Sequence, residues 1–168
     1  MTNTKPTLHI ICGKIAAGKS TLAEKLATAE RTIKISEDDW LVALFSDEMT
    51  SISDYVRCAA KLQSVMGPHI ISLLNTGTSA ILDFPANTIS QRAWMKQVID
   101  AAEAEHKLHY LDTPDEICLE RLHARNLSGN HPFSATQEQF QIISKHFVAP
   151  TADEGFDIIK YDANGHRA

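Results

Sequence analysis

The sequence predicts a three-layer α/β domain with a parallel sheet, and three observations support this fold class. Short apolar segments rich in isoleucine alternate along the chain with longer segments of helical pattern. The apolar segments show little polar alternation, which is typical of strands that are covered on both faces in a parallel sheet. A length of 168 residues, of which 43% are apolar and 22% charged, suits one globular domain with a substantial core. We therefore expect residues 1–168 to form a single domain whose strands are connected by right-handed crossovers.

Five segments have the length and composition of buried strands, and five others have helical patterns. The expected strands are residues 8–12, 32–36, 80–84, 108–111 and 156–160. The expected helices are residues 20–29, a long one within 38–75, 90–105, 114–126 and 136–147. Capping residues support several of these helix boundaries. Gly77 follows the long helix, Ser90 is a suitable N-cap for the helix over 90–105, and Thr113 precedes Pro114 where the fourth helix begins.

Composition and charge argue against several classes of protein. No apolar run approaches the ~20 residues that a spanning helix needs. The first ten residues lack the layout of a signal peptide, so we expect a cytoplasmic protein that does not enter a membrane. Cys12, Cys58 and Cys118 are dispersed singly, which favours buried apolar side chains over a metal or redox site. The net charge of −5 without a basic stripe makes nucleic acid a disfavoured partner, although a local basic groove stays possible.

A phosphate-binding motif stands between the first expected strand and the first expected helix. Residues 13–20, GKIAAGKS, match G-x-x-x-x-G-K-[ST] at every fixed position. In this motif the glycines let backbone N–H groups turn towards a triphosphate, and the start of the helix adds its dipole. The lysine, Lys19, reaches the β- and γ-phosphates, and the hydroxyl of Ser20 ligates Mg²⁺. The residues expected to bind the nucleotide are Gly13, Ala16, Ala17, Gly18, Lys19, Ser20 and Thr21.

Carboxylates follow the second and third expected strands, at the edge of the sheet where ligands bind in open α/β folds. One of the acids in Glu37-Asp38-Asp39 can serve as the base for an acceptor hydroxyl in phosphoryl transfer. The alternative for these acids is an N-terminal helical turn that is favourable to the helix dipole. Asp83 ends an apolar strand, which is the usual form of the carboxylate that positions Mg²⁺ beside such a loop.

Two arginines, Arg121 and Arg125, lie four residues apart on one expected helix, directly before the loop-like segment 126–134. Planar guanidinium groups suit transferring phosphates, and a mobile segment can bring them over the γ-phosphate. We therefore expect a small helical lid over about residues 121–135. The alternative is a pair of surface arginines bound to Glu120 or Asp115.

Together these residues resemble the small P-loop kinases that include the 5′-kinase domain of polynucleotide kinases, the zeta toxins and the chloramphenicol phosphotransferases. The resemblance runs from about residue 8 to residue 161 and implies a P-loop NTPase fold with a five-stranded parallel sheet. It also implies ATP with Mg²⁺ and a lid that carries catalytic arginines. In the polynucleotide kinases an aspartate soon after the second strand activates the acceptor hydroxyl, and Asp38 takes that place here.

The same resemblance implies candidates for binding the acceptor. Asp39 and Trp40 match the family's Asp-Asp-aromatic pattern, but Leu41 stands where the substrate-binding arginine would be. Asn87 and Arg92 resemble the asparagine turn after the third strand and its following arginine, so they are expected to orient the acceptor or the phosphate.

The expected function is transfer of the γ-phosphate of ATP to a hydroxyl of a small molecule. Residues 39–66, where such kinases hold their acceptor, contain only two cations, Arg57 and Lys61, which favours a neutral or cationic acceptor. A GTPase fits poorly because the sequence has no N-K-x-D motif. Two alternatives remain: a nucleotide-dependent regulatory ATPase module and a 5′-hydroxyl polynucleotide kinase.

Overall fold

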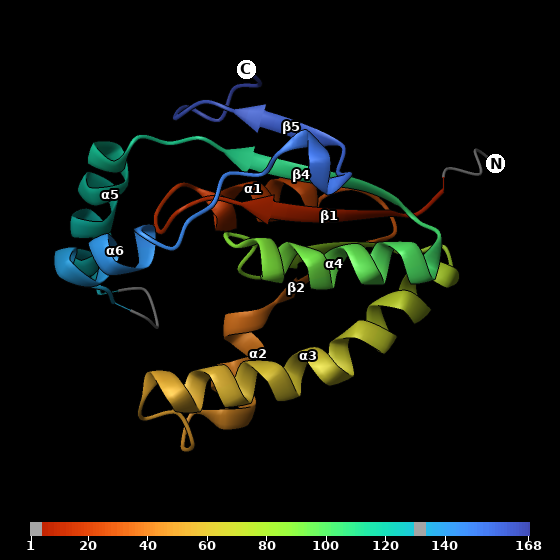
Figure 1. Ribbon diagram of the computed structural model, residues 1–168, viewed down its shortest axis with the longest axis horizontal. Helices are drawn as coiled ribbons and strands as arrows, with labels where there is room; N and C mark the ends of the chain where they lie inside the picture. Colours follow the sequence, from red (N-terminus) through yellow and green to blue (C-terminus); the bar gives the residue numbers. More distant parts are fainter. Residues whose placement is uncertain (1–4, 130–133) are drawn as a thin grey trace.

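The computed structural model describes residues 5–129 and 134–168, and five strands in this part of the chain form one sheet. The strands are β1 (Thr7–Cys12), β2 (Thr32–Ser36), β3 (Ser79–Asp83), β4 (Glu105–Leu111) and β5 (Ile158–Tyr161). Their order is β2-β3-β1-β4-β5, and every neighbouring pair is parallel (Figure 1). The predicted α/β fold with a five-stranded parallel sheet is confirmed.

Helices cover both faces of the sheet, and the sheet separates two buried clusters. They are α1 (Lys19–Leu26), α2 (Glu37–Phe45), α3 (Ile52–Asn75), α4 (Ile89–Ala102), α5 (Asp115–Ser128) and α6 (Gln137–Ser144), with a short 3₁₀ turn, η1 (Ala152–Glu154). Ile10 and Leu82 pack on one face with side chains of α2, α3 and α4. Ile11 and Ile81 pack on the other face with side chains of α1, α5 and α6. Burial on both faces explains why the strands read as nearly continuous apolar runs.

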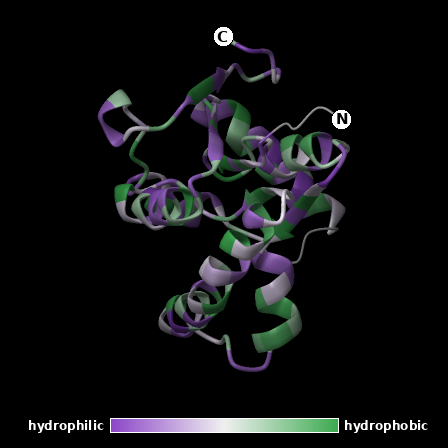
Figure 2. Ribbon diagram, turned by 90° about the vertical axis from the view of Figure 1, so that its right-hand side faces the viewer, coloured by the Kyte–Doolittle hydropathy of each residue, from purple (hydrophilic) through white to green (hydrophobic). Residues whose placement is uncertain are grey.

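The long helical region between β2 and β3 is two helices. A long helix was expected within residues 38–75, and α3 is that helix, but a separate helix, α2, precedes it and ends at Phe45. The break has a local cause, because the side chain of Ser51 accepts a hydrogen bond from the N–H of Asp54 and caps a new helix. The two helices project from the body of the domain, as two views at right angles show (Figures 1 and 2).

Several element boundaries also differ from the prediction, and two of them lie at the ends of α4. The N-cap of α4 is Thr88 instead of Ser90, because Thr88 forms a capping box with Gln91. Residue Glu105 belongs to β4 and not to the preceding helix, which ends at Ala102. The predicted helix stop at Gly77 is confirmed: this glycine has φ 85°, and its N–H donates to the carbonyl of Leu74.

The strand order places the site. Because all neighbouring strands are parallel, the connections after β1, β2 and β3 emerge at the same edge of the sheet. Figure 1 shows α5 and α6 beyond this edge, where the arrows of β1 and β4 end. Ligands bind at such carboxyl edges in open α/β sheets. None of the helices in the described part of the chain combines the length and hydropathy that a membrane crossing requires.

Candidate active site

The loop between β1 and α1 folds its backbone into the left-handed region twice. Ala16 has φ 60° and Gly18 has φ 105°. A Cβ atom on Gly13 would lie 3.2 Å from the Cβ atoms of both Ala17 and Leu111, so this position has no room for a larger residue. Successive N–H groups in such a backbone form a concave site for anions, and the N-terminus of α1 follows at Lys19. The loop therefore has the strand–loop–helix context that phosphate binding needs.

The ammonium group of Lys19 lies inside this loop. Its Nζ donates hydrogen bonds to the carbonyl oxygen of Gly13 at 2.7 Å and to that of Lys14 at 2.8 Å. Burial lowers the pKa of Lys19, while the nearby carboxylate of Asp83 acts in the opposite direction. The structure thus holds a cation at the point where the loop would receive phosphate oxygens.

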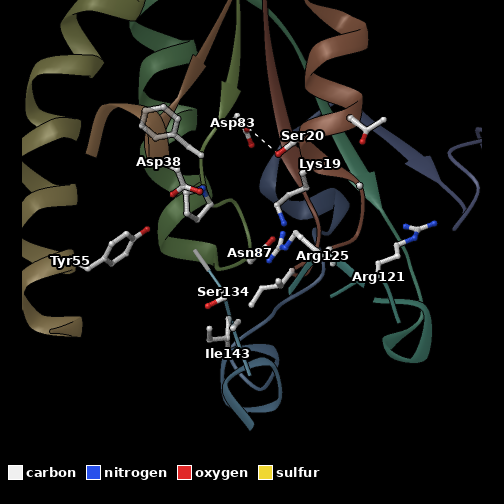
Figure 3. Close-up of a pocket in the computed structure, with 17 residues that line it drawn as sticks. Lys19, Ser20, Asp38, Tyr55, Asp83, Asn87, Arg121, Arg125, Ser134 and Ile143 are labelled. Atoms are coloured by element: carbon white, nitrogen blue, oxygen red, sulfur yellow. Dashed lines mark hydrogen bonds between the residues drawn. The ribbon is translucent and has the colours of Figure 1, made fainter. Parts of the chain in front are cut away.

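Ser20 and Asp83 bring two oxygen atoms together beside the loop. The hydroxyl of Ser20, in α1, donates at 3.5 Å to Oδ2 of Asp83, the last residue of β3 (Figure 3). Burial raises the pKa of Asp83, and the cations of Lys19 and Lys34 lower it. Mg²⁺ prefers oxygen ligands and usually takes only one or two from the protein beside phosphates and water. This donor set therefore fits a magnesium ion shared with a triphosphate.

The acidic segment after β2 separates into residues with different surroundings. Ser36 caps α2 by accepting a hydrogen bond from the N–H of Asp39 at 3.2 Å. Asp38 lines the pocket that Lys19 and Ser20 also line, which we call the main pocket. Across this pocket, the charge of Asp38 favours the charged form of Arg125. Of the described residues that line this pocket, none is Asp39 or Trp40, and the Trp40 side chain is exposed. The geometry therefore favours Asp38 over Asp39 as the residue facing a substrate.

Arg121 and Arg125 come from α5 and have different partners. Arg121 donates from Nη1 to the carbonyl of Ala17 at 3.3 Å and from Nη2 to that of Ala163 at 2.6 Å. Arg125 lines the pocket, and its buried Nε has no hydrogen-bond partner among the described residues. Burial lowers the pKa of Arg125.

The structure also bears on the alternative partner of the two arginines and on the rest of the predicted lid. Asp115, the alternative partner of the arginines, instead binds Lys14 at 2.5 Å. Of the predicted lid, residues 130–133 lie outside the described residues, whereas Ser134 and Ala135 line the pocket.

Hydrogen bonds to several segments hold Asn87 at the centre of the site. Its Oδ1 accepts from the N–H of Gly13 at 3.0 Å. Its own N–H donates to the side chain of Gln91 at 2.9 Å, and its carbonyl accepts from the N–H of Val148 at 2.8 Å. The side chain also lines the main pocket. Asn87 therefore joins the phosphate-binding loop to α4 and to the segment that follows α6.

The structure places Arg92 away from the pocket. Its side chain is fully buried and forms two hydrogen bonds with the carboxylate of Glu154, at 2.7 and 2.9 Å. Its Nη1 donates to the carbonyl oxygens of Ala86 and Val148 at 2.9 and 2.8 Å. The expected contact between Arg92 and an acceptor is thus corrected to a structural role, because its donors are committed inside the fold.

The main pocket has a volume of about 570 Å³, and its lining includes Lys19, Asp38, Arg121 and Arg125. Figure 3 shows Asp38 and Tyr55 on one side, Lys19 and Arg125 in the middle, and Arg121 on the far side. A second pocket of about 340 Å³ adjoins it, and Gly18, Thr21 and Arg121 line both. The segment after β5 also lines the second pocket, through Ala163, Asn164 and Gly165.

The sequence matches the AAA domain family (AAA_33) over residues 8–150, which is most of the chain. The chain belongs to this AAA domain family. No curated protein matches it. A candidate kinase from Chloroflexus aurantiacus j-10-fl has the same fold, with a TM-score of 0.72 and 21% identity over 94% of this chain and 85% of that chain.

Two further solved structures share the fold of this AAA domain. A gluconokinase from Sinorhizobium meliloti 1021 has a TM-score of 0.60 and 15% identity, over 93% of this chain and 83% of that one. A chain of the Pnkp1/Rnl/Hen1 RNA repair complex has a TM-score of 0.58 and 21% identity, over 88% of this chain and 48% of its own. The structural likeness establishes a P-loop kinase-like fold. Identities this low do not determine the substrate.

Two residues of the AAA domain site were not singled out from the sequence. Tyr55 lines the main pocket from α3, and its hydroxyl donates to the carboxylate of Glu37 at 2.9 Å. Glu37 was noted only as one of three neighbouring acids, and Tyr55 lies in segment 39–66, of which the sequence analysis used only the cations. No sequence signal pairs residues 18 positions apart across a helix break.

Proposed function

We propose that this AAA domain transfers the γ-phosphate of ATP to a hydroxyl group of a neutral or cationic small molecule. The observation that carries the proposal is the shared pocket. It joins a phosphate-binding loop and its lysine to an oxygen pair suited to Mg²⁺, a carboxylate at Asp38 and a guanidinium at Arg125. Phosphoryl transfer needs positioning, charge neutralisation and a carboxylate for the attacking hydroxyl. The kinase-like fold supports the same reading.

In the proposed reaction the acceptor oxygen bonds to the γ-phosphorus, the bond to the β–γ bridging oxygen breaks, and ADP leaves. Asp38 orients the hydroxyl and takes its proton. Lys19 and the loop N–H groups hold the phosphates, and Arg125, whose Nε lacks a partner among the described residues, neutralises the moving phosphoryl group. Ser20 and Asp83 would hold Mg²⁺, which supplies charge neutralisation at the β- and γ-phosphates.

The second pocket is the proposed place of the nucleoside. It starts at the phosphate-binding loop, where Gly18 and Thr21 line both pockets, so a nucleotide can pass from one to the other. Arg121 forms the wall between the loop and the segment after β5, to which it is tied through Ala163. Arg121 therefore belongs to the nucleotide side, and Arg125 to the reacting phosphate.

The charges along the pocket support the choice of acceptor. The described cations that line it, Lys19, Arg121 and Arg125, all belong to the phosphate loop or to α5. On the side of α2, α3 and β3, the lining residues are Asp38, Tyr55, Asp83, Phe84, Pro85 and Asn87. An anionic acceptor on this side would face carboxylates without a compensating arginine, and like charges in a partly buried site repel strongly.

A labelling screen tests the proposal. The purified protein is given γ-labelled ATP, Mg²⁺ and, in separate reactions, amino sugars, nucleosides and 5′-hydroxyl oligonucleotides. We expect label on an amino sugar or a nucleoside. Label on the oligonucleotide alone would refute the proposed acceptor class. ATP hydrolysis that no acceptor alters, together with an ATP-dependent protein partner, would instead support a regulatory ATPase module.

A further inference from the structure

A buried carboxyl group that the proposed reaction does not use lies behind Tyr55, a residue that lines the pocket. Glu37 is the first residue of α2, and its side chain is only 1% exposed. Its Oε2 accepts a hydrogen bond at 2.9 Å from the hydroxyl of Tyr55 in α3. The same two helices bury Leu41 and Cys58 in the apolar core. A polar pair therefore sits at the end of an otherwise apolar contact between α2 and α3.

This pair costs stability where it stands. A buried carboxyl group loses its hydration, and apolar side chains of similar size often stabilise such a contact better. The pKa of Glu37 is raised to about 7, mainly by burial and also by the carboxylates of Asp38 and Asp83, while the Tyr55 hydrogen bond acts in the opposite direction. Groups whose pKa is shifted by burial beside a pocket are frequent at functional positions. The pair therefore calls for a functional explanation.

The direction of the hydrogen bond limits what Tyr55 can offer a ligand. A phenol has one proton to donate, and in this structure the proton of Tyr55 goes to Glu37. The lone pairs of the phenolic oxygen remain able to accept a hydrogen bond. Tyr55 lines the pocket, and its hydroxyl points to the side where Asp38 lies (Figure 3).

We propose that Tyr55, held by Glu37, is a specificity-determining residue whose phenolic oxygen accepts a hydrogen bond from a second hydroxyl or an amino group of the acceptor. This inference rests on the proposed phosphotransferase activity and adds a requirement on the substrate. The acceptor carries a hydrogen-bond donor close to the hydroxyl that Asp38 deprotonates. A carboxylate or a phosphate at that position would set its own lone pairs against those of Tyr55.

The ionisation of Glu37 makes this contact dependent on pH. When Glu37 is ionised, it can only accept, so Tyr55 must donate to it and keeps its lone pairs for the ligand. When Glu37 is protonated, it can donate to Tyr55 and occupy those lone pairs. The charged or titratable groups that interact with Glu37 are Tyr55 from α3, Asp38 from α2 and Asp83 from β3. Acceptor binding should therefore weaken as the pH falls through about 7.

Steady-state kinetics of three variants test the inference. The acceptor is the amino sugar or nucleoside that the parental protein labels fastest, and KM and kcat are measured at pH 6 and pH 8. Tyr55→Phe should raise the KM for the acceptor about 3- to 10-fold, the effect of one lost hydrogen bond. Its kcat and its KM for ATP should stay within about twofold, because the contact does not involve the reacting atoms. Tyr110→Phe is the matched control, since Tyr110 also donates to a carboxylate, that of Asp112, and does not line the pocket.

Glu37→Gln separates the hydrogen bond from the charge. The glutamine carbonyl still accepts the Tyr55 proton, so the KM for the acceptor should stay near the parental value at pH 8 and lose its rise at pH 6. Unfolding midpoints of all variants show whether each is folded. An unchanged acceptor KM in Tyr55→Phe, or an equal rise in the KM for ATP, would overturn the inference. Failure of the proposed function is visible earlier, because the parental protein would then label no acceptor, and the inference would fall with it.

Discussion

The side-chain oxygen of Asn87 accepts a hydrogen bond from the N–H of Gly13 at 3.0 Å, which ties the turn after β3 to the first residue of the phosphate-binding loop. The family resemblance suggests that Asn87 orients the acceptor or the phosphate. Because the Asn87 side chain lines the main pocket, it is also within the space that a bound substrate would occupy. The hydrogen bond shows in addition that Asn87 shapes the loop itself.

Asn87→Ala should therefore weaken nucleotide binding. The change leaves the N–H of Gly13 without its side-chain partner, whereas the two backbone hydrogen bonds of residue 87 can persist. Losing one such bond corresponds to about a 3- to 10-fold rise in the Kd for ATP, measured by calorimetry with Mg²⁺ present. Asn75→Ala, at an exposed position at the end of α3, is the control. An unchanged Kd in Asn87→Ala would show that the loop keeps its shape without this contact.

Asp38→Asn and Asp39→Asn should differ sharply in phosphate transfer. Asp38 lines the pocket, and losing a general base lowers transfer by roughly 10²-fold or more. Asp39 keeps its backbone contact with Ser36 in either variant, so Asp39→Asn should lose less than about tenfold. Both variants should bind ATP nearly as the parental protein does. Equal losses in the two variants, measured by label transfer, would contradict the assignment of Asp38 as the base.

The strands and the phosphate-binding loop could be predicted because their signals are local. A buried parallel strand is apolar along its whole length, and the loop motif fixes glycines where the backbone turns or packs closely, as Gly13 and Gly18 show. The break between α2 and α3 was missed although Ser51 is a good N-cap, because the apolar pattern continues on both sides of it.

The parts of the site that could not be predicted depend on contacts between distant residues. Arg92 resembled an acceptor-binding arginine, but its partner Glu154 lies 62 positions later, in a turn that no sequence pattern connects to it. Glu37 and Tyr55 are separated by the helix break, so their pairing required the packing of α2 against α3. Whether a charged residue faces a pocket or the core is decided by such packing.

Glu154→Ala should destabilise the fold strongly, because it leaves the guanidinium of Arg92 buried without its counterion. Breaking one side of a buried pair costs about 3–5 kcal/mol, measured as the free energy of unfolding in urea. Asp153→Ala, at the exposed neighbouring position in the same turn, should change it by less than about 0.5 kcal/mol. Arg92→Met should cost a similar amount to Glu154→Ala, and the double variant should cost less than the two losses added together.

Acidification should change stability through two buried groups that act in opposite directions. His109 is buried between His9 and Tyr161, at 2.9 and 2.8 Å. Its pKa is lowered to about 4, mainly by burial and also by nearby positive charges, while Asp157 acts in the opposite direction. Its contribution is complete above the unfolded value of 6.5 and is lost as the pH falls towards 4. The pKa of Glu37 is instead raised to about 7, so its contribution is complete below 4.5 and is lost as the pH rises through 7.

Because these contributions oppose each other between about pH 7 and pH 5, single variants should reveal them. His109→Gln removes the group that loses stability in acid, so the free energy of unfolding of this variant should rise relative to the parental protein as the pH is lowered from 7 to 5. Glu37→Gln removes the group that gains stability in acid, so its free energy should fall over the same range. The change in the free energy of unfolding between pH 7 and pH 5 can differ from the parental change by as much as about 3 kcal/mol, since one pKa unit corresponds to about 1.4 kcal/mol. His69→Gln, at an exposed position of α3, should keep the parental slope. Slopes of the same sign in His109→Gln and Glu37→Gln, relative to the parental protein, would contradict this assignment of the two buried groups.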